Sequence, residues 1–290
     1  MADRGNRRRP RLRRLLMRST TAIVMAGRRE GSIDPLAAAA GLADKCLVPV
    51  AGRPMIEHVL MALADTPSIA RIIVSINDPA LLDAVPAARA LIDEGRLVAV
   101  RAKHNLVDSL FAAIDGQAFP ILVTTADNVL LTPAAVEQIG TAGDTAGAKS
   151  VAVAFTRRAS VLAAHPDGQR RFYRFRDDSY SNCNAYWIGS PAALAVAEVF
   201  RSGGQFAKHP VRILRALGLY NLIAFRLGLG TIDGAFARFS RRFGFPIRAV
   251  ILDDGAVAID VDNPRTLAVA ETIFASRKVS QPALETAHAE

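Results

Sequence analysis

Three aspartates stand where predicted strands end, and their spacing is typical of a carboxylate site for a divalent cation. Asp127 closes the apolar run "FPILVTTADN" (119–128), and Asp260 and Asp262 lie two residues apart in "AIDVDNP". In a strand, residues two apart share one face. Carboxylates from two segments are ligands that magnesium accepts while it keeps waters and substrate phosphates. We therefore predict a magnesium site formed by Asp127, Asp260 and Asp262.

A turn of small residues follows the first apolar run, "TTAIVMAG". Met25, Ala26 and Gly27 form this turn, where backbone amides can approach a bound group closely. Arg28 and Arg29 come next, and guanidinium groups match the geometry of phosphate oxygens. The loop has neither Walker P-loop spacing nor a GxGxxG fingerprint. We therefore predict that this turn binds an anion, although its spacing matches neither of these two motifs.

Lys45 lies beyond that loop in "ADKCLVPVAGRPM". A lysine here can reach back to phosphates as a mobile point charge and stabilise charge that develops during phosphoryl transfer. An ordinary surface lysine is the alternative. Ser109 in "VDSLFAA" has no GxSxG context, so we interpret it as a base or ribose contact or as a plain helix residue. The five histidines form no zinc pattern.

Apolar runs and helical patterns alternate along the chain, and this order sets the expected fold. The expected strands are 20–27, 70–78, 96–102, 119–128, 149–158, 181–190, 245–252 and 257–262. The expected helices are 55–66, 87–95, 106–116 and a terminal helix capped by Asn263 with Pro264 at its first position. The alternation predicts a three-layer, Rossmann-like α/β fold with a mostly parallel mixed sheet. Ligands of such sheets bind beyond the carboxyl ends of the strands.

The charge is concentrated in an N-terminal arm. Residues 1–18 carry eight Arg and one Asp, so the net charge of +9 falls to about +2 without them. We expect this arm to be disordered, and it lacks the apolar stretch of a secretory signal. Residues 19–275 are expected to form one domain, with a nucleotide-binding half (19–148), a second half (149–275) and a helical insert at about 200–243. Residues 276–290 are expected to form a tail.

The composition also bears on location. The chain has no uninterrupted apolar run long enough to predict a transmembrane helix. The two cysteines, Cys46 and Cys183, indicate no disulfide framework and suit a reducing cytosol. We expect a cytoplasmic protein. Peripheral membrane contact through the arm or the insert stays open, as does a buried core helix in the insert.

With these residues in place, the chain resembles the nucleotidylyltransferases of the glycosyltransferase-A type, the MobA-like and cytidylyltransferase-like NTP transferases. The likeness covers about residues 20–130 and 250–272, and the segment Leu47–Leu60 is its most specific part. It implies that the backbone of the first turn recognises the base, that Arg28 or Arg29 binds triphosphate and that Lys45 is the phosphate lysine. "DSL" (108–110) looks like the Asp-Ser-Val of the cytidylyl branch, in which the serine contacts the pyrimidine.

The resemblance implies magnesium-dependent transfer of NMP, with CTP the favoured donor, to a phosphorylated small-molecule acceptor. Lys45, Arg28 and Asp127 would be catalytic. The first loop lacks the family's Gly-x-Gly, and Asp44 replaces the usual Pro before the lysine, which leaves the nucleobase open. A glycosyltransferase of the same fold and a non-catalytic nucleotide-binding protein remain alternatives. A nucleic-acid binder is disfavoured because the arm contains no aromatic residue for stacking.

The acceptor is expected to bind in the second half of the chain. "SNCNAYW" places Asn182, Asn184 and Tyr186 in one row of a strand. The two amides are candidates to bind hydroxyls of a polyol or sugar, or to make cross-strand structural contacts. Lys208 and Arg212, at the start of the helical insert, are candidates to bind the acceptor phosphate.

Overall fold

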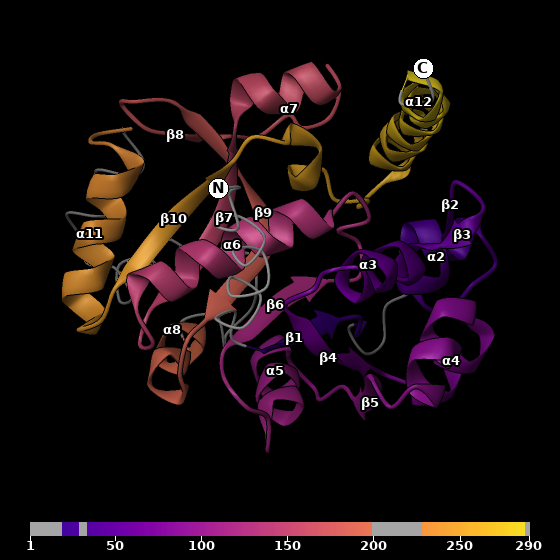
Figure 1. Ribbon diagram of the computed structural model, residues 1–290, viewed down its shortest axis with the longest axis horizontal. Coiled ribbons are helices and arrows are strands. Elements are labelled where there is room, and N and C mark those ends of the chain that lie inside the picture. The colour runs from indigo at the N-terminus through magenta and orange to yellow at the C-terminus, as the bar shows by residue number, and fades with distance from the viewer. Residues whose placement is uncertain (1–18, 29–33, 199–227, 288–290) are drawn as a thin grey trace, which may run out of the picture.

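The computed structural model describes residues 19–28, 34–198 and 228–287. An eight-stranded sheet runs through the molecule (Figure 1). Its strands are β1 (Thr20–Met25), β4 (Ile69–Ile76), β5 (Leu97–Arg101), β6 (Ile121–Thr125), β7 (Val151–Arg157), β8 (Tyr173–Arg174), β9 (Ser179–Ile188) and β10 (Ile247–Leu252). A separate two-stranded sheet consists of β2 (Pro49–Val50) and β3 (Arg53–Pro54).

The main sheet has the order β10-β7-β9-β6-β1-β4-β5, with β8 paired to β9. The pairs β10–β7, β6–β1, β1–β4 and β4–β5 are parallel, and β9 runs antiparallel to β6, β7 and β8. Met25 at the end of β1 is level with Ser75 of β4 and Thr125 of β6. The carboxyl ends of these strands therefore meet at one edge, and the predicted mostly parallel α/β sheet is confirmed.

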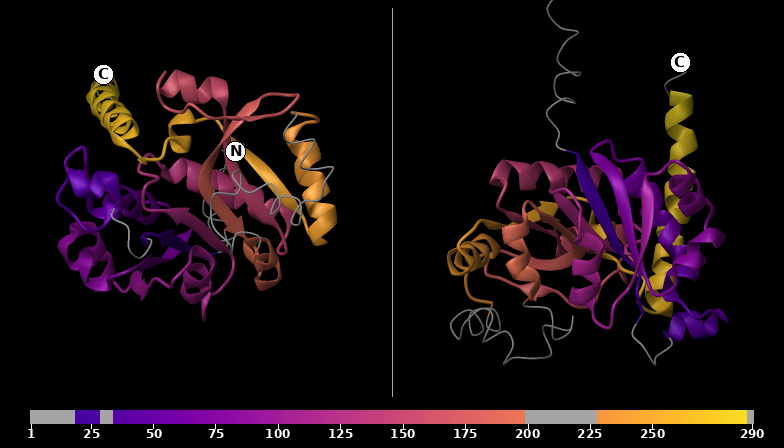
Figure 2. Two further views of the ribbon diagram at one scale, coloured as in Figure 1. Left: turned by 180° about the vertical axis from the view of Figure 1, so that it is seen from behind. Right: turned by 90° about the horizontal axis from the view of Figure 1, so that it is seen from below.

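Helices cover both faces of the sheet and complete three layers (Figure 2). The α-helices are α2 (Pro35–Ala39), α3 (Met55–Ala64), α4 (Pro86–Asp93), α5 (Leu106–Ile114), α6 (Pro133–Ala146), α7 (Arg158–Ala164), α8 (Ala195–Glu198), α11 (Ile232–Phe243) and α12 (Pro264–Ala287). Short 3₁₀ helices are η1 (Lys45–Leu47), η2 (Pro79–Ala84), η3 (Pro191–Leu194) and η5 (Gly255–Ala258). One core contains buried residues of α3, α4, α6 and α12, and the other contains those of α5 and α11.

Trp187 anchors β9 in the middle of the sheet. Its side chain is fully buried, and Gly143 of α6 lies against its ring. A β-carbon at Gly143 would lie 2.3 Å from the ring, far inside contact distance, so only glycine lets α6 approach β9 this closely. Such close packing holds the antiparallel strand between β6 and β7.

The predicted strand at 257–262 is wrong. Residues 255–258 form η5, whose start is capped by Asp254: its Oδ1 accepts a hydrogen bond from the Ala256 N–H at 2.9 Å. Val261 then makes a single backbone bond to Asp127, N to O at 3.0 Å. The segment is apolar because it is buried, not because it extends the sheet.

The predicted cap of the terminal helix is confirmed. Asn263 Oδ1 accepts a hydrogen bond from the Thr266 N–H at 3.2 Å, and Pro264 is the first residue of α12. The helix continues to Ala287, through most of the expected tail. The N-terminal arm and residues 200–227 of the expected insert lie outside the described residues, whereas α11 supplies a helix in the rest of that insert.

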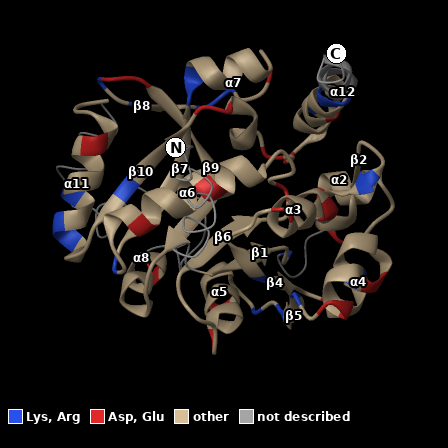
Figure 3. Ribbon diagram, viewed as in Figure 1, with Lys and Arg blue, Asp and Glu red and all other residues tan. Residues whose placement is uncertain are grey.

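Acidic and basic residues are interspersed over the described elements in the view of Figure 3. Within the described part of the chain, no helix is long and apolar enough to cross a membrane.

Candidate active site

The turn after β1 is fixed by its neighbours. The Ala26 N–H donates to the Ser75 carbonyl at 2.8 Å, and the Arg28 N–H donates to Asn77 Oδ1 at 2.6 Å. A β-carbon at Gly27 would lie 3.0 Å from Cβ of Ala102, closer than ordinary contact. The first turn is thus packed tightly against the ends of β4 and β5, as a backbone surface for a ligand requires.

A polar cleft of about 610 Å³ lies beside this turn. Arg28, Asp44, Asn77, Asp78 and Arg101 are among its lining residues. The guanidinium Nε of Arg28 pairs with Asp44 Oδ1 at 3.2 Å, and Asp44 is buried. The cleft therefore has two guanidinium groups and two carboxylates at the carboxyl edge of the sheet, and the guanidinium groups are its candidate phosphate ligands.

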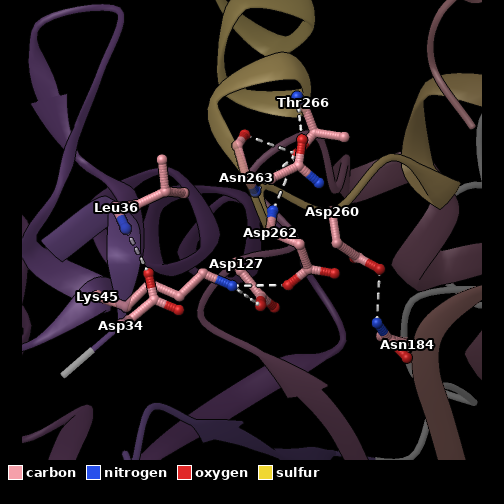
Figure 4. Close-up of polar contacts among 9 residues, drawn as sticks. All are labelled: Asp34, Leu36, Lys45, Asp127, Asn184, Asp260, Asp262, Asn263 and Thr266. Carbon is pink, nitrogen blue, oxygen red and sulfur yellow. Dashed lines mark hydrogen bonds and ion pairs between the residues drawn. The ribbon is translucent and has the colours of Figure 1, made fainter. Parts of the chain in front are cut away.

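Lys45 lies between two of the predicted metal ligands. Its Nζ is 2.7 Å from Asp127 Oδ2 and 2.7 Å from Asp262 Oδ1, and its side chain points to both in Figure 4. Burial alone lowers the pKa of the Lys45 ammonium, but the charges of Asp127 and Asp262 outweigh it and raise that pKa above its ordinary value. The ammonium is the counter-ion of these carboxylates.

Asp260 is the buried member of the acidic group, at 7% exposure. Its Oδ2 accepts a hydrogen bond from Asn184 Nδ2 at 2.6 Å (Figure 4). Burial raises the pKa of Asp260 well above its usual value, and the carboxylates of Asp127 and Asp262 raise it further. The bond between the Val261 N–H and the Asp127 carbonyl holds this segment against the end of β6.

The start of α12 positions Asp262. The Asp262 N–H donates to Thr266 Oγ1 at 2.9 Å, and the Asn263 N–H donates to the same oxygen at 3.2 Å. These bonds satisfy backbone amides that precede the first helical turn. They also fix the backbone position from which the Asp262 side chain extends (Figure 4). The side chain can thereby reach Lys45 from the exposed side of the cluster.

The carboxylates fit a magnesium ion that is completed by substrate. Among the described residues, no three His, Cys, Asp or Glu side chains are grouped as a ready-made metal site. Magnesium, however, is commonly held by one or two carboxylates together with substrate phosphates. Asp127 Oδ1 and Asp260 Oδ1 are both buried and accept no hydrogen bond within the described structure. Buried acceptor oxygens without partners are what a bound cation would satisfy.

The polar row on β9 lies next to this cluster. Asn182 Oδ1 accepts from the Asn184 N–H at 2.6 Å and from the Tyr186 hydroxyl at 3.3 Å. Asn184 has a φ of 46°, a left-handed conformation that asparagine tolerates better than most residues. Asn182, Asn184 and Tyr186 therefore form one hydrogen-bonded chain that leads to Asp260.

Ser109 holds the loop before α5. Its buried Oγ accepts from the Lys103 N–H at 2.8 Å and donates to the Asn105 carbonyl at 2.8 Å. The hydroxyl thus binds the loop backbone in this structure. The predicted contact of Ser109 with a base or ribose stays a prediction.

Comparison with known proteins identifies the family. Residues 22–222 match the profile of the MobA-like NTP transferase domain. The chain belongs to that family. A search of curated proteins found no match.

Solved structures share the fold of this MobA-like NTP transferase. A hypothetical transferase from Thermus thermophilus has 26% sequence identity and a TM-score of 0.68, over 87% of this chain and 100% of that one. A CMP:2-keto-3-deoxy-manno-octonic acid synthetase complexed with CTP has 18% identity and a TM-score of 0.55, over 89% and 100%. A 4-diphosphocytidyl-2C-methyl-D-erythritol synthase from Anaerococcus prevotii DSM 20548 has 12% identity and a TM-score of 0.55, over 90% and 98%.

The transferase fold brings most of the predicted site residues to one edge of the sheet. Lys45, Asp127, Asp260 and Asp262 meet there, and Asn184 joins them. The predicted residues Arg29, Lys208 and Arg212 lie outside the described residues.

Sequence reasoning missed Asn77 and Arg101, which line the polar cleft with Arg28. Both stand at the ends of predicted strands. The rule that selected Gly27 and Asp127, ligand binding at the carboxyl ends of strands, would have found them as well.

Proposed function

We propose that this protein is a magnesium-dependent nucleotidylyltransferase that transfers NMP from an NTP to a phosphorylated small-molecule acceptor. The convergence of Lys45 with Asp127, Asp260 and Asp262 at the carboxyl edge of the sheet carries this proposal. An ordinary surface lysine would not lie between two carboxylates from segments 82 and 217 residues away. CTP is the favoured donor because "DSL" (108–110) resembles the cytidylyl branch.

In the proposed reaction, an oxygen of the acceptor phosphate forms a bond to the α-phosphorus of the NTP. The bond from that phosphorus to the bridging oxygen of the β-phosphate breaks, and pyrophosphate leaves with the electron pair. The nucleophile is already an anion, so no strong general base is required, and catalysis needs mainly positioning and charge neutralisation. Arg28 and Arg101 face the polar cleft in which the triphosphate would bind. Lys45 would exchange its carboxylate partners for phosphate oxygens.

Asp127, Asp260 and Asp262 would hold magnesium. When bound, the ion would neutralise charge on the triphosphate and on the leaving pyrophosphate. Asn184 would keep the Asp260 carboxylate oriented through its 2.6 Å hydrogen bond.

Pyrophosphate release tests the proposal. Each of the four NTPs with magnesium is offered against phosphorylated polyols, sugars, choline and alcohols. We expect release with one NTP, reduced about 10²–10³-fold by Lys45→Met or Asp127→Asn. Lys149→Met, at an exposed lysine, is the matched control and should keep wild-type turnover. Lys45→Met or Asp127→Asn turnover equal to wild type would refute the assignment of these residues, and absence of magnesium-dependent NTP binding would refute the function itself.

A further inference from the structure

A second cavity, of about 340 Å³, lies on the face of the sheet that carries α5, α8 and α11. Its described lining is almost wholly apolar and comes from these helices and from β6, β7, β9 and β10. The aromatic side chains Phe155, Phe236, Phe239 and Phe243 contribute to it. Phe236 packs edge-on against Phe155 and Phe239, with centroid distances of 5.7 and 5.6 Å. In Figure 1, α8 and α11 lie beside the half of the sheet that contains β7 and β10.

This cavity adjoins the carboxylate cluster through lining residues that are close to the cluster in sequence or are hydrogen-bonded toward it. Thr125, the last residue of β6, lines it and precedes Asp127 by two residues. Asn182 and Tyr186 also line it, and their hydrogen-bonded chain reaches Asp260 through Asn184. The Thr125 hydroxyl oxygen is buried and has no hydrogen-bond partner among the described residues. The end of the cavity nearest the carboxylates is therefore its polar end.

The opposite end is apolar. Ile188 lines the cavity there and is paired with Ile121 at the start of β6, four residues before Thr125. At 3.3 Å per residue, the cavity extends about 13 Å along the strand. Ile247 lies at this far end as well, because it pairs with Val151, which in turn pairs with Ile188. A ligand that fills the cavity would thus have a polar head at the carboxylates and an apolar body along the sheet.

The volume indicates a ligand site. Protein interiors are close-packed and rarely contain voids much larger than a water molecule, which occupies about 30 Å³ in the liquid. The cavity, at about 340 Å³, is far larger than such a void and falls within the usual range of ligand pockets. A sugar or polyol placed there would lose water from its hydroxyls without gaining partners. A hydrocarbon would gain burial over its whole length.

We propose that the acceptor is a phosphorylated alcohol with a hydrocarbon chain, and that the chain binds in this apolar cavity. The phosphate then lies at the polar end, near Thr125 and Asn182, where it can reach the α-phosphorus of an NTP bound beyond β1. The inference rests on the proposed function only for the role of that phosphate as the attacking group. The cavity itself would bind the hydrocarbon in the absence of any reaction.

A series of n-alkyl phosphates from ethyl to octyl tests the inference, with binding measured by calorimetry in the presence of magnesium, without NTP and below micelle-forming concentrations. We expect the Kd to fall up to about fourfold for each added methylene, the value that corresponds to burial of one CH₂. Val153→Phe places a larger side chain in the cavity and should abolish the dependence on chain length. Val98→Phe, the same change on the exposed edge strand β5, should preserve it. If Val153→Phe fails to fold, Leu106→Trp at an exposed position of the lining replaces it.

Equal affinity for ethyl and octyl phosphate would overturn the inference. An equal loss in Val153→Phe and Val98→Phe would overturn it too.

Pyrophosphate assays separate this inference from the proposed function. Dependence of binding on chain length without pyrophosphate release from any NTP would support the cavity and refute the transferase reaction. Release with polar acceptors, combined with no effect of chain length, would support the reaction and refute the cavity.

Discussion

The counter-ion role of Lys45 leads to a prediction about stability. Lys45→Met keeps the length of the apolar stem and removes the ammonium group, so Asp127 and Asp262 each lose a 2.7 Å charge-assisted hydrogen bond. Asp262 is 65% exposed, and exposed pairs contribute only about 0–1 kcal/mol. Asp127 is 22% exposed, and breaking a buried pair costs about 3–5 kcal/mol. We expect an intermediate loss of about 2–3 kcal/mol in metal-free buffer, or about 4–12 °C in Tm.

The response to magnesium distinguishes this loss from simple misfolding. In the wild type, a divalent cation must displace the Lys45 ammonium from the carboxylates. In Lys45→Met, the carboxylates of Asp127, Asp260 and Asp262 lack that positive partner, so magnesium alone should bind more tightly. A ligand at 100 times its Kd stabilises the native state by about 2.7 kcal/mol. Magnesium should therefore restore much of the stability of the variant and add less to the wild type.

Urea unfolding followed by circular dichroism measures both effects, with and without millimolar MgCl₂ at matched ionic strength. Lys149→Met removes an exposed lysine outside the cluster and should match the wild type in stability and in magnesium response. The reasoning fails if Lys45→Met is as stable as Lys149→Met. It also fails if magnesium stabilises the wild type more than Lys45→Met, because Lys45 would then not compete for the carboxylates.

Three further predictions concern single side chains. In urea unfolding, Asn184→Ala should be about 1 kcal/mol less stable than Asn184→Gly. Both variants lose the hydrogen bond to Asp260, but only alanine is strained at a φ of 46°. Equal stability of the two variants would contradict the left-handed conformation of residue 184. Cys46 and Cys183 are buried, and burial raises the pKa of the Cys46 thiol to about 12, so a thiol reagent such as DTNB should label neither until urea is added. Burial lowers the pKa of His58 in the folded protein, so the unfolded chain takes up a proton at a higher pH than the folded chain does. The free energy of unfolding should therefore fall as the pH drops below about 6.5. His58→Gln should reduce this fall, and an unchanged dependence of the unfolding free energy on pH would exclude His58 as its source.

The first half of the chain (19–148) was largely predictable because its elements are periodic and consecutive. Each expected strand from 20 to 128 is present, and the helices between them are present as well. In a parallel sheet the carboxyl ends of strands gather at one edge. Gly27 and Asp127 could therefore be placed near each other although 99 residues separate them along the sequence.

Contacts that depend on tertiary structure were not predictable. The partners of Lys45 lie 82 and 217 residues away, and no local spacing encodes them. The run 257–262 looked like a strand because it is apolar, but the Asp254 cap starts a 3₁₀ turn instead. Helix α6 (Pro133–Ala146) was missed because Ala, Gly and Thr give it a weak apolar period. Its close approach to Trp187 at Gly143 is a tertiary contact that no local pattern encodes.

The bulge on β9 lets one strand contact both the carboxylate cluster and the apolar cavity. Between the pairs Val153–Tyr186 and Phe155–Asn182, β7 advances by two residues and β9 by four. The extra length includes Asn184, whose left-handed φ aims its amide at Asp260 while Asn182 and Tyr186 stay in the lining of the apolar cavity. A regular strand would give all three side chains one orientation. Because bulges commonly redirect a side chain beside an active site, we interpret this one as the feature that couples the cavity to the carboxylate cluster.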